Sequence, residues 1–143
     1  MTPEAPLLFE TRLTTRWGEQ DLFAHINNVH YLRYFEEGRV RWLASLGLPI
    51  SGPGGGSGLG EGPIVARVAV DYLMPVRYPA ELLLRLYLGR MGTRSLTLLH
   101  TLAQVETPDQ VCARGEVVLV WYDHDRGESR PLPAQLSALA SRR

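Results

Sequence analysis

One segment of the chain carries the periodic pattern of a long helix. From Asn27 or Asn28, either of which is a good N-cap, apolar residues recur at helical spacing. These apolar residues are Leu32, Phe35, Trp42, Leu43 and Leu46. Charged residues take the opposite face, and Gly47 and Pro49 end the pattern. The pattern therefore predicts a helix of about 18 residues, and no other stretch of the sequence predicts a long helix.

Most of the remaining chain has the shorter periodicity of β-strands. Turn residues separate the apolar runs at short spacing and no helical pattern lies between the later runs, which is typical of antiparallel hairpins. The predicted strands cover residues 7–17, 64–74, 81–90, 96–105 and 111–122. In the second of them one face is expected to carry Ile64, Ala66, Val68, Val70, Tyr72 and Met74. Residues 123–131 are polar, and residues 133–143 predict a short terminal helix.

A long helix after one strand, followed by a four-stranded meander, is an α+β pattern. The leucine- and valine-rich face of the sheet is expected to wrap around the helix. The length of the chain predicts one domain over residues 1–143. Helix and sheet both carry more apolar surface than a monomer needs, which predicts a homo-oligomer, either a dimer or a tetramer.

Residues 49–63 differ from the rest, because they contain seven glycines and three prolines. Such a composition is typical of a flexible surface loop. A phosphate-binding loop is disfavoured, because no Gly-Lys-Ser/Thr follows and no strand precedes the segment. Gly55-Gly56-Ser57-Gly58-Leu59 also lacks the last glycine of a nucleophile elbow.

Composition and charge narrow the chemistry further. Lys+Arg and Asp+Glu are both 15, so the net charge of zero speaks against nucleic acid or an anionic membrane as the main partner. Every basic residue is arginine, which excludes a Schiff-base lysine and a Walker lysine. Cys112 is the one cysteine, and the histidines have no metal-binding spacing, so we expect neither a metal nor another cofactor. The sequence has no signal-peptide pattern and no run of transmembrane length, and a soluble cytoplasmic protein is expected.

The segment before and within the predicted helix resembles a known family. It reads Asp-x-x-x-His-Ile-Asn-Asn-x-x-Tyr-x-x-Tyr-Phe-Glu-Glu-x-Arg, beginning at Asp21 and ending at Arg39. This is similar to the signature of hotdog-fold acyl-CoA thioesterases of the 4-hydroxybenzoyl-CoA thioesterase type. Tyr72-Leu73-Met74-Pro75 also resembles the tyrosine-x-x-proline strand end of that family. The chain departs from the family pattern at Pro79-Ala80 and in the length of the 52–62 loop.

The resemblance implies a fold and a set of roles. The fold would be the hotdog fold, a five-stranded antiparallel sheet around one long helix. The activity would be hydrolysis of acyl-CoA to the free acid and coenzyme A. Asp21 would be the nucleophile or general base, and backbone amides around Asn28 would form the oxyanion hole.

The chemistry of thioester hydrolysis explains these residue types. The reaction needs a nucleophile or a base that activates water, and donors for the developing oxyanion. A carboxylate and the free N–H groups at a helix N-terminus supply both. The expected catalytic residues are Asp21, His25 and Asn28, and the expected substrate-binding residues are Asn27, Tyr31, Tyr34 and Phe35.

Structural readings of the same residues stay open. Asp21 is otherwise a turn aspartate, and Asn27 and Asn28 are otherwise loop formers and caps. His25 either polarises the substrate carbonyl, orients Asp21, or is hydrogen-bonded in its loop. The three aromatic residues line either an acyl pocket or the core. Several arginines near strand ends are candidates for the phosphates of coenzyme A: Arg67, Arg77, Arg90 and Arg94.

Two other functions compete with hydrolysis. A hotdog protein that only binds an acyl thioester would gain nothing from the carboxylate of Asp21 beside an anionic ligand. Hotdog hydratases and dehydratases use Asp-x-Asn-Pro-x-His or His-x-Phe-Pro-Gly-His forms. In this chain Asp21 and His25 are separated by three residues without a proline, which disfavours that class.

Overall fold

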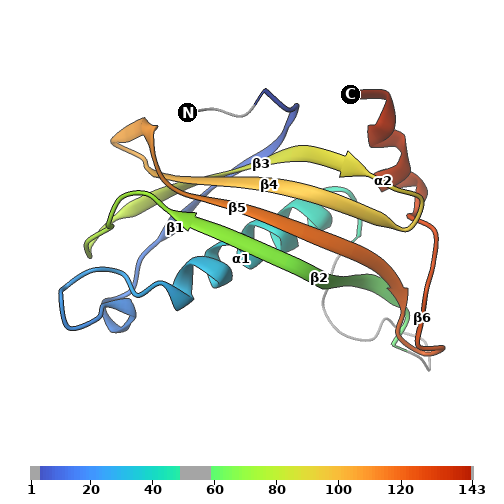
Figure 1. Cartoon of the computed structure of the whole chain (residues 1–143), viewed down its shortest axis with the longest axis horizontal. Coiled ribbons are helices and arrows are strands. Elements are labelled where there is room, and N and C mark those ends of the chain that lie inside the picture. Colours follow the sequence, from blue (N-terminus) through green and yellow to red (C-terminus); the bar gives the residue numbers. More distant parts are fainter. Residues whose placement is uncertain (1–3, 49–58, 143) are drawn as a thin grey trace.

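The computed structural model describes residues 4–48 and 59–142. An antiparallel sheet packs across one long helix, α1, in the α+β arrangement that the sequence predicts (Figure 1). The elements are β1 (Leu7–Thr14), η1 (Trp17–Glu19), α1 (Val29–Ser45), β2 (Glu61–Tyr72), β3 (Glu81–Met91), β4 (Ser95–Gln104), β5 (Thr107–Asp123), β6 (Glu128–Ser129), α2 (Ala134–Ser137) and η2 (Ala138–Arg142). The short strand β6 falls in the polar stretch where the sequence predicts none. The predicted terminal helix is present as α2 and η2.

The order of the strands corrects the predicted meander. The order across the sheet is β1-β3-β4-β5-β2, so β3, β4 and β5 form hairpins but β2 pairs with β5 at the edge. The meander is therefore wrong for β2. Residues 73–80 make no tight turn: they leave the sheet, and the carbonyl of Val76 accepts a 2.7 Å hydrogen bond from the N–H of Ile26. This connection crosses beside the segment that precedes α1 before the chain enters β3.

A β-bulge in β2 corrects the predicted face of that strand. Val65 pairs with Leu119 and Arg67 with Val118, so the register shifts between them. One extra residue reverses the alternation, because successive side chains point to opposite faces. The sequence predicted that Ile64 and Val68 share a face. In the structure they lie on opposite faces of the sheet.

The helix α1 lies where the sequence predicts it, with 17 residues, and Phe35, Trp42 and Leu43 of the predicted stripe are buried. Its buried residues are Tyr31, Tyr34, Phe35, Gly38, Arg39, Trp42 and Leu43. Leu32, which was expected on this stripe, is instead 42% exposed. Asn28 occupies the N-cap position, but its side chain makes no capping hydrogen bond.

Glycine lets the helix approach the sheet closely. Phe35 is fully buried against Gly115 of β5, and a Cβ at Gly115 would lie 2.6 Å from Phe35 Cε2. No real Cβ contact is that short, so a side chain at Gly115 would push the aromatic ring of Phe35 out of its position. The same contact fixes the depth of the helix N-terminal half, from which the site residues project.

Gly115→Ala is therefore expected to lower the free energy of unfolding by about 1–3 kcal/mol, the usual cost of overpacking a core. Urea denaturation would measure the change. Gly18→Ala is the matched control, because a Cβ there meets nothing within 4 Å. Equal stability of the two variants would contradict this packing account.

The glycine-rich loop predicted over residues 49–63 lies largely outside the described residues. At its described end, the N–H groups of Leu59 and Gly60 donate to the two carboxylate oxygens of Asp125, at 2.7 and 2.9 Å. These two hydrogen bonds lower the pKa of the Asp125 carboxyl, and the bond from Gly60 has the larger effect. None of the helices in the described part of the chain has the length and apolar character needed to cross a membrane.

Candidate active site

The segment between η1 and α1 folds into a tight loop. The N–H of Asp21 donates to the carbonyl of His25 at 2.8 Å, and the N–H of Ala24 donates to the carbonyl of Asp21 at 3.1 Å. Ala24 has a φ of 60°, the left-handed conformation that such a turn requires. The loop is then fixed to residues 73–80 by the hydrogen bond between Ile26 and Val76. The motif recognised in the sequence is therefore a rigidly paired loop.

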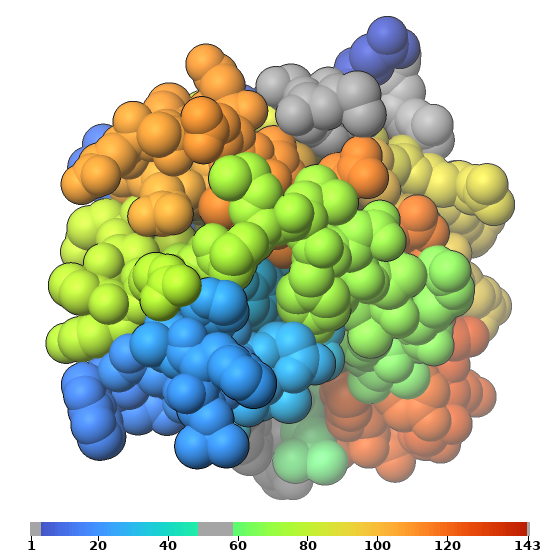
Figure 2. Space-filling model, turned by 60° about the vertical axis from the view of Figure 1, so that its left-hand side comes forward, coloured from blue at the N-terminus to red at the C-terminus, as the bar shows by residue number. Residues whose placement is uncertain are grey.

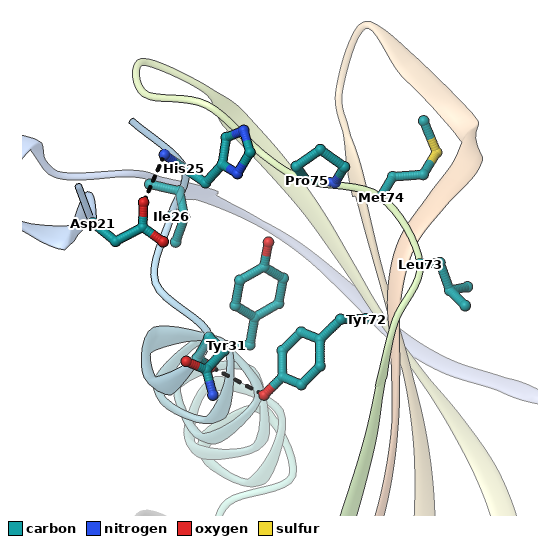
Figure 3. A pocket seen from close by; sticks show the side chains of 9 residues that line it. Asp21, His25, Ile26, Tyr31, Tyr72, Leu73, Met74 and Pro75 are labelled. Carbon is teal, nitrogen blue, oxygen red and sulfur yellow. Dashed lines mark hydrogen bonds between the residues drawn. The ribbon is translucent and has the colours of Figure 1, made fainter. Parts of the chain in front are cut away.

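The Asp21 carboxylate is anchored through one of its two oxygens. Oδ1 accepts hydrogen bonds from the N–H of Phe23 at 2.8 Å and from the N–H of His25 at 3.3 Å. Within the described residues, Oδ2 has no hydrogen-bond partner. In Figure 3 this second oxygen is turned toward the pocket in which Tyr31 lies. The carboxylate is thus oriented by the loop and keeps one oxygen available.

A pocket of about 310 Å³ opens beside this carboxylate (Figure 3). Its lining residues are Asp21, His25, Ile26, Asn28, Tyr31, Tyr72, Leu73, Met74 and Pro75. The blue loop and the yellow-green segment after β2 meet on the face shown in Figure 2. One wall is thus the predicted motif, and the other comes from the end of β2.

Four predicted site residues share this pocket, namely Asp21, His25, Asn28 and Tyr31. The contacts between His25 and Asp21 run through the main chain, so it is the backbone N–H of His25 that orients the carboxylate. Tyr31 is buried, and burial raises its pKa to about 12, so its phenol stays protonated.

The other three predicted residues do not line the pocket. Tyr34 donates a 2.8 Å hydrogen bond to Glu19 Oε1, and burial followed by this bond raises the pKa of Tyr34. Phe35 belongs to the core, where its ring contacts that of His100. Asn27 holds the loop: its N–H donates to the carbonyl of Glu19 at 2.9 Å. Their positions assign these three residues to supporting the loop and the helix.

A free donor stands at the helix N-terminus. The N–H of Asn28 makes no hydrogen bond to any residue that the structure describes, while the carbonyl of Asn28 accepts one from the Tyr72 hydroxyl at 3.1 Å. The first N–H groups of a helix lack intrahelical partners and carry partial positive charge. Asn28 and Asp21 line one pocket, an arrangement that suits a carbonyl undergoing nucleophilic attack.

Sequence reasoning did not select the second wall of the pocket. Tyr72 forms an edge-to-face contact with Tyr31 at 5.1 Å between ring centroids, and Leu73, Met74 and Pro75 continue the wall. The signal was present in the tyrosine-x-x-proline strand end. Nothing in the local pattern indicates that this strand end lies against the loop.

Over residues 4–48 and 59–142, no three His, Cys, Asp or Glu side chains are grouped so that they could hold a metal ion. The expectation of a metal-independent site stays a prediction.

Comparison with family models identifies a superfamily. Residues 15–139 match the family model described as the thioesterase-like superfamily. The uncharacterized protein YsmA of Bacillus subtilis (strain 168) is 30% identical over 125 residues, which cover 85% of this chain and 77% of YsmA.

Solved structures give the same result. The PA2801 protein of Pseudomonas aeruginosa, a proposed thioesterase, is 38% identical with a TM-score of 0.86, covering 94% of this chain and 98% of PA2801. Slr0204, a 1,4-dihydroxy-2-naphthoyl-CoA thioesterase from Synechocystis, has a TM-score of 0.78 at 17% identity, covering 91% of this chain and 93% of its own. At that identity the likeness to Slr0204 concerns the fold alone.

Proposed function

The chain belongs to the thioesterase-like superfamily, and from this premise we propose that it hydrolyses acyl-CoA thioesters to the free acid and coenzyme A. The observation that carries the proposal is the Asp21 carboxylate, held by two backbone N–H groups with its second oxygen on the pocket. The hotdog arrangement of sheet and helix supports the same assignment.

In the proposed reaction the thioester carbonyl lies between Asp21 and the N–H of Asn28. Either Asp21 Oδ2 attacks the carbonyl carbon and water then cleaves the resulting anhydride, or Asp21 takes a proton from the water that attacks. The carbonyl oxygen gains negative charge, which the Asn28 N–H and the positive end of α1 stabilise. The sulfur leaves with the bonding electron pair as the coenzyme A thiolate, a good leaving group that needs little assistance.

The acyl group is expected to lie against the apolar wall of the pocket. Tyr31 and Tyr72 present aromatic rings there, and Leu73 and Met74 extend the surface at 48% and 42% exposure. His25 lines the same pocket, and in the proposed reaction its imidazole contacts the substrate carbonyl. A carboxylate with a free oxygen on the pocket favours hydrolysis over simple binding of an anionic thioester.

The proposal is tested with a small panel of acyl-CoAs that includes saturated and aromatic acyl groups. Release of free thiol is followed in solution, and mass spectrometry identifies the products. We expect free acid and coenzyme A from at least one substrate. Tight binding of the panel without cleavage would support the binding module instead, and addition or loss of water with the thioester intact would support a hydratase or dehydratase.

A homodimer, alone or paired into a tetramer, is expected from the outer edge of β2, which pairs with no other strand among residues 4–48 and 59–142. Beside that edge Val65, Val68 and Tyr72 are 49%, 42% and 47% exposed, and Val29 of α1 is 56% exposed. A second copy that extends the sheet would bury this surface and pair the edge. Light scattering at micromolar concentration should give at least twice the 16.0 kDa of one chain. A 16.0 kDa particle would contradict the assembly.

Turnover is expected to be independent of metal ions, because the proposed donors are a carboxylate and a backbone N–H. Activity should survive exhaustive treatment with EDTA. Loss of activity that zinc restores would show that a metal takes part.

A cytoplasmic location stays a prediction.

A further inference from the structure

A second cavity lies between the end of β1 and the outer side of α1, separate from the pocket that holds Asp21. Its volume is about 510 Å³. The residues that line it are Arg12, Leu13, Thr14, Thr15, Arg16, Glu19, Arg33, Tyr34, Glu37 and Arg41. Four arginines face two glutamates there, although the whole chain is neutral. The cavity is therefore a local concentration of positive charge.

Both glutamates and one arginine are already engaged. Glu19 Oε1 accepts hydrogen bonds from the Tyr34 hydroxyl at 2.8 Å and from the N–H of Arg16 at 2.7 Å. Glu37 pairs with Arg41 at 3.1 Å. Arg41 also donates to the carbonyl of Arg12 at 2.8 Å, which ties α1 to β1. These contacts make the wall of the cavity rigid.

Three guanidinium groups are left over. Arg12, Arg16 and Arg33 are exposed, and none of them forms an ion pair with a residue in the described ranges. Several arginines elsewhere on the protein are matched with carboxylates, as Arg85 is with Glu10 at 2.8 Å and Arg67 with Glu116 at 3.0 Å. Like charges repel, so grouping three unmatched guanidiniums in one cavity costs stability unless an anion joins them.

We propose that this cavity binds a phosphate- or diphosphate-bearing ligand. Guanidinium groups offer paired N–H donors that match phosphate oxygens, and the cavity presents them from β1, from the loop that follows and from α1. Donors on separate elements can surround a multiply charged group, which a single surface arginine cannot do. The ligand class is thus a phosphate ester such as a nucleotide.

Two kinds of molecule carry such a phosphate group. The ligand is either the nucleotide end of the coenzyme A substrate, which rests on the proposed function, or a free nucleotide that binds independently of catalysis. The first source is sterically reasonable: Arg16 and Asp21 are five residues apart, so their Cα atoms are separated by at most about 18 Å. An extended pantetheine arm is of that order of length.

The test compares nucleotide binding between the wild-type protein and two variants. The probe is adenosine 3′,5′-bisphosphate, the nucleotide of coenzyme A without its pantetheine arm, titrated calorimetrically. The double variant Arg12→Gln/Arg33→Gln removes two exposed guanidiniums and should bind at least about tenfold more weakly. Arg126→Gln is the matched control, since its side chain is 72% exposed and lies on the β5–β6 turn; it should bind as the wild type does.

Kinetics then separate the two sources. If the site holds the substrate's own nucleotide, the double variant raises KM for acyl-CoA about tenfold and leaves KM for the matching acyl-pantetheine unchanged. If the site holds a free nucleotide, the double variant binds adenosine 3′,5′-bisphosphate more weakly, while its KM values for acyl-CoA and for acyl-pantetheine equal those of the wild type. Wild-type binding no stronger than that of the double variant would overturn the proposal. Because the titration requires no turnover, a failure of the hydrolase assignment is distinguishable from a failure of this site.

Discussion

Asp21→Asn is expected to lower kcat for acyl-CoA hydrolysis by about 10²–10⁴, the usual scale for losing a positioned acid–base group. The amide has nearly the same volume and keeps an oxygen that can accept the hydrogen bonds from Phe23 and His25. The loop should therefore persist, while the free anionic oxygen on the pocket disappears. Steady-state kinetics on the best substrate measure the loss, with circular dichroism to check the fold.

His25 gives the companion comparison for this result. Its backbone N–H contacts Asp21 and survives truncation, so His25→Ala should cost less than Asp21→Asn. The two changes together should cost less than the product of their separate losses, because both groups act in one step. Near-normal hydrolysis by a folded Asp21→Asn protein would make Asp21 a structural turn residue and favour the binding module.

The second large effect is expected at the N–H of Asn28. Proline lacks this N–H, and the φ of −53° at Asn28 is within the range of a proline ring. Asn28→Pro should therefore remove the oxyanion donor and lower kcat by about 10²–10³. The matched control is Asn28→Ala, which keeps the N–H and changes only a side chain that makes no capping bond.

The comparison between these two variants is decisive for the donor. Equal activity of Asn28→Pro and Asn28→Ala would show that this N–H does not stabilise the oxyanion. If Asn28→Pro loses the fold as judged by circular dichroism, an acyl-CoA ketone analogue can be titrated into Asn28→Ala instead. Unchanged affinity for the analogue is expected there, because the N–H is retained.

The local sequence pattern predicted the helices and strands better than it predicted which strands pair with one another. The helix α1 could be predicted because the apolar residues of an amphipathic helix recur every three or four positions along the sequence. The place of β2 beside β5 is a long-range choice, and the turn residues Pro75 and Pro79 look the same in a hairpin and in a crossing connection. The bulge after Val65 was equally hidden, because one inserted residue leaves the apolar alternation of the sequence unchanged.

The candidate site shows the same difference between local and long-range prediction. Asp21, His25 and Asn28 stand close together in the sequence, so the motif and the helix signal predicted their proximity. The opposite wall around Tyr72 belongs to a distant strand, whose approach depends on the whole sheet. Tyr34 was expected to bind substrate, yet helical spacing alone could not show that its hydroxyl is turned to Glu19.

The most direct test of the central claim follows the fate of the thioester in the presence of Asp21→Asn. The purified variant is mixed with a substrate that the wild type cleaves, and binding is measured by calorimetry while mass spectrometry follows the acyl-CoA. We predict that the variant binds the substrate at least as tightly as the wild-type KM indicates and that the thioester stays intact. Cleavage of the bound acyl-CoA at the wild-type rate would contradict the role of Asp21 and with it the proposed mechanism.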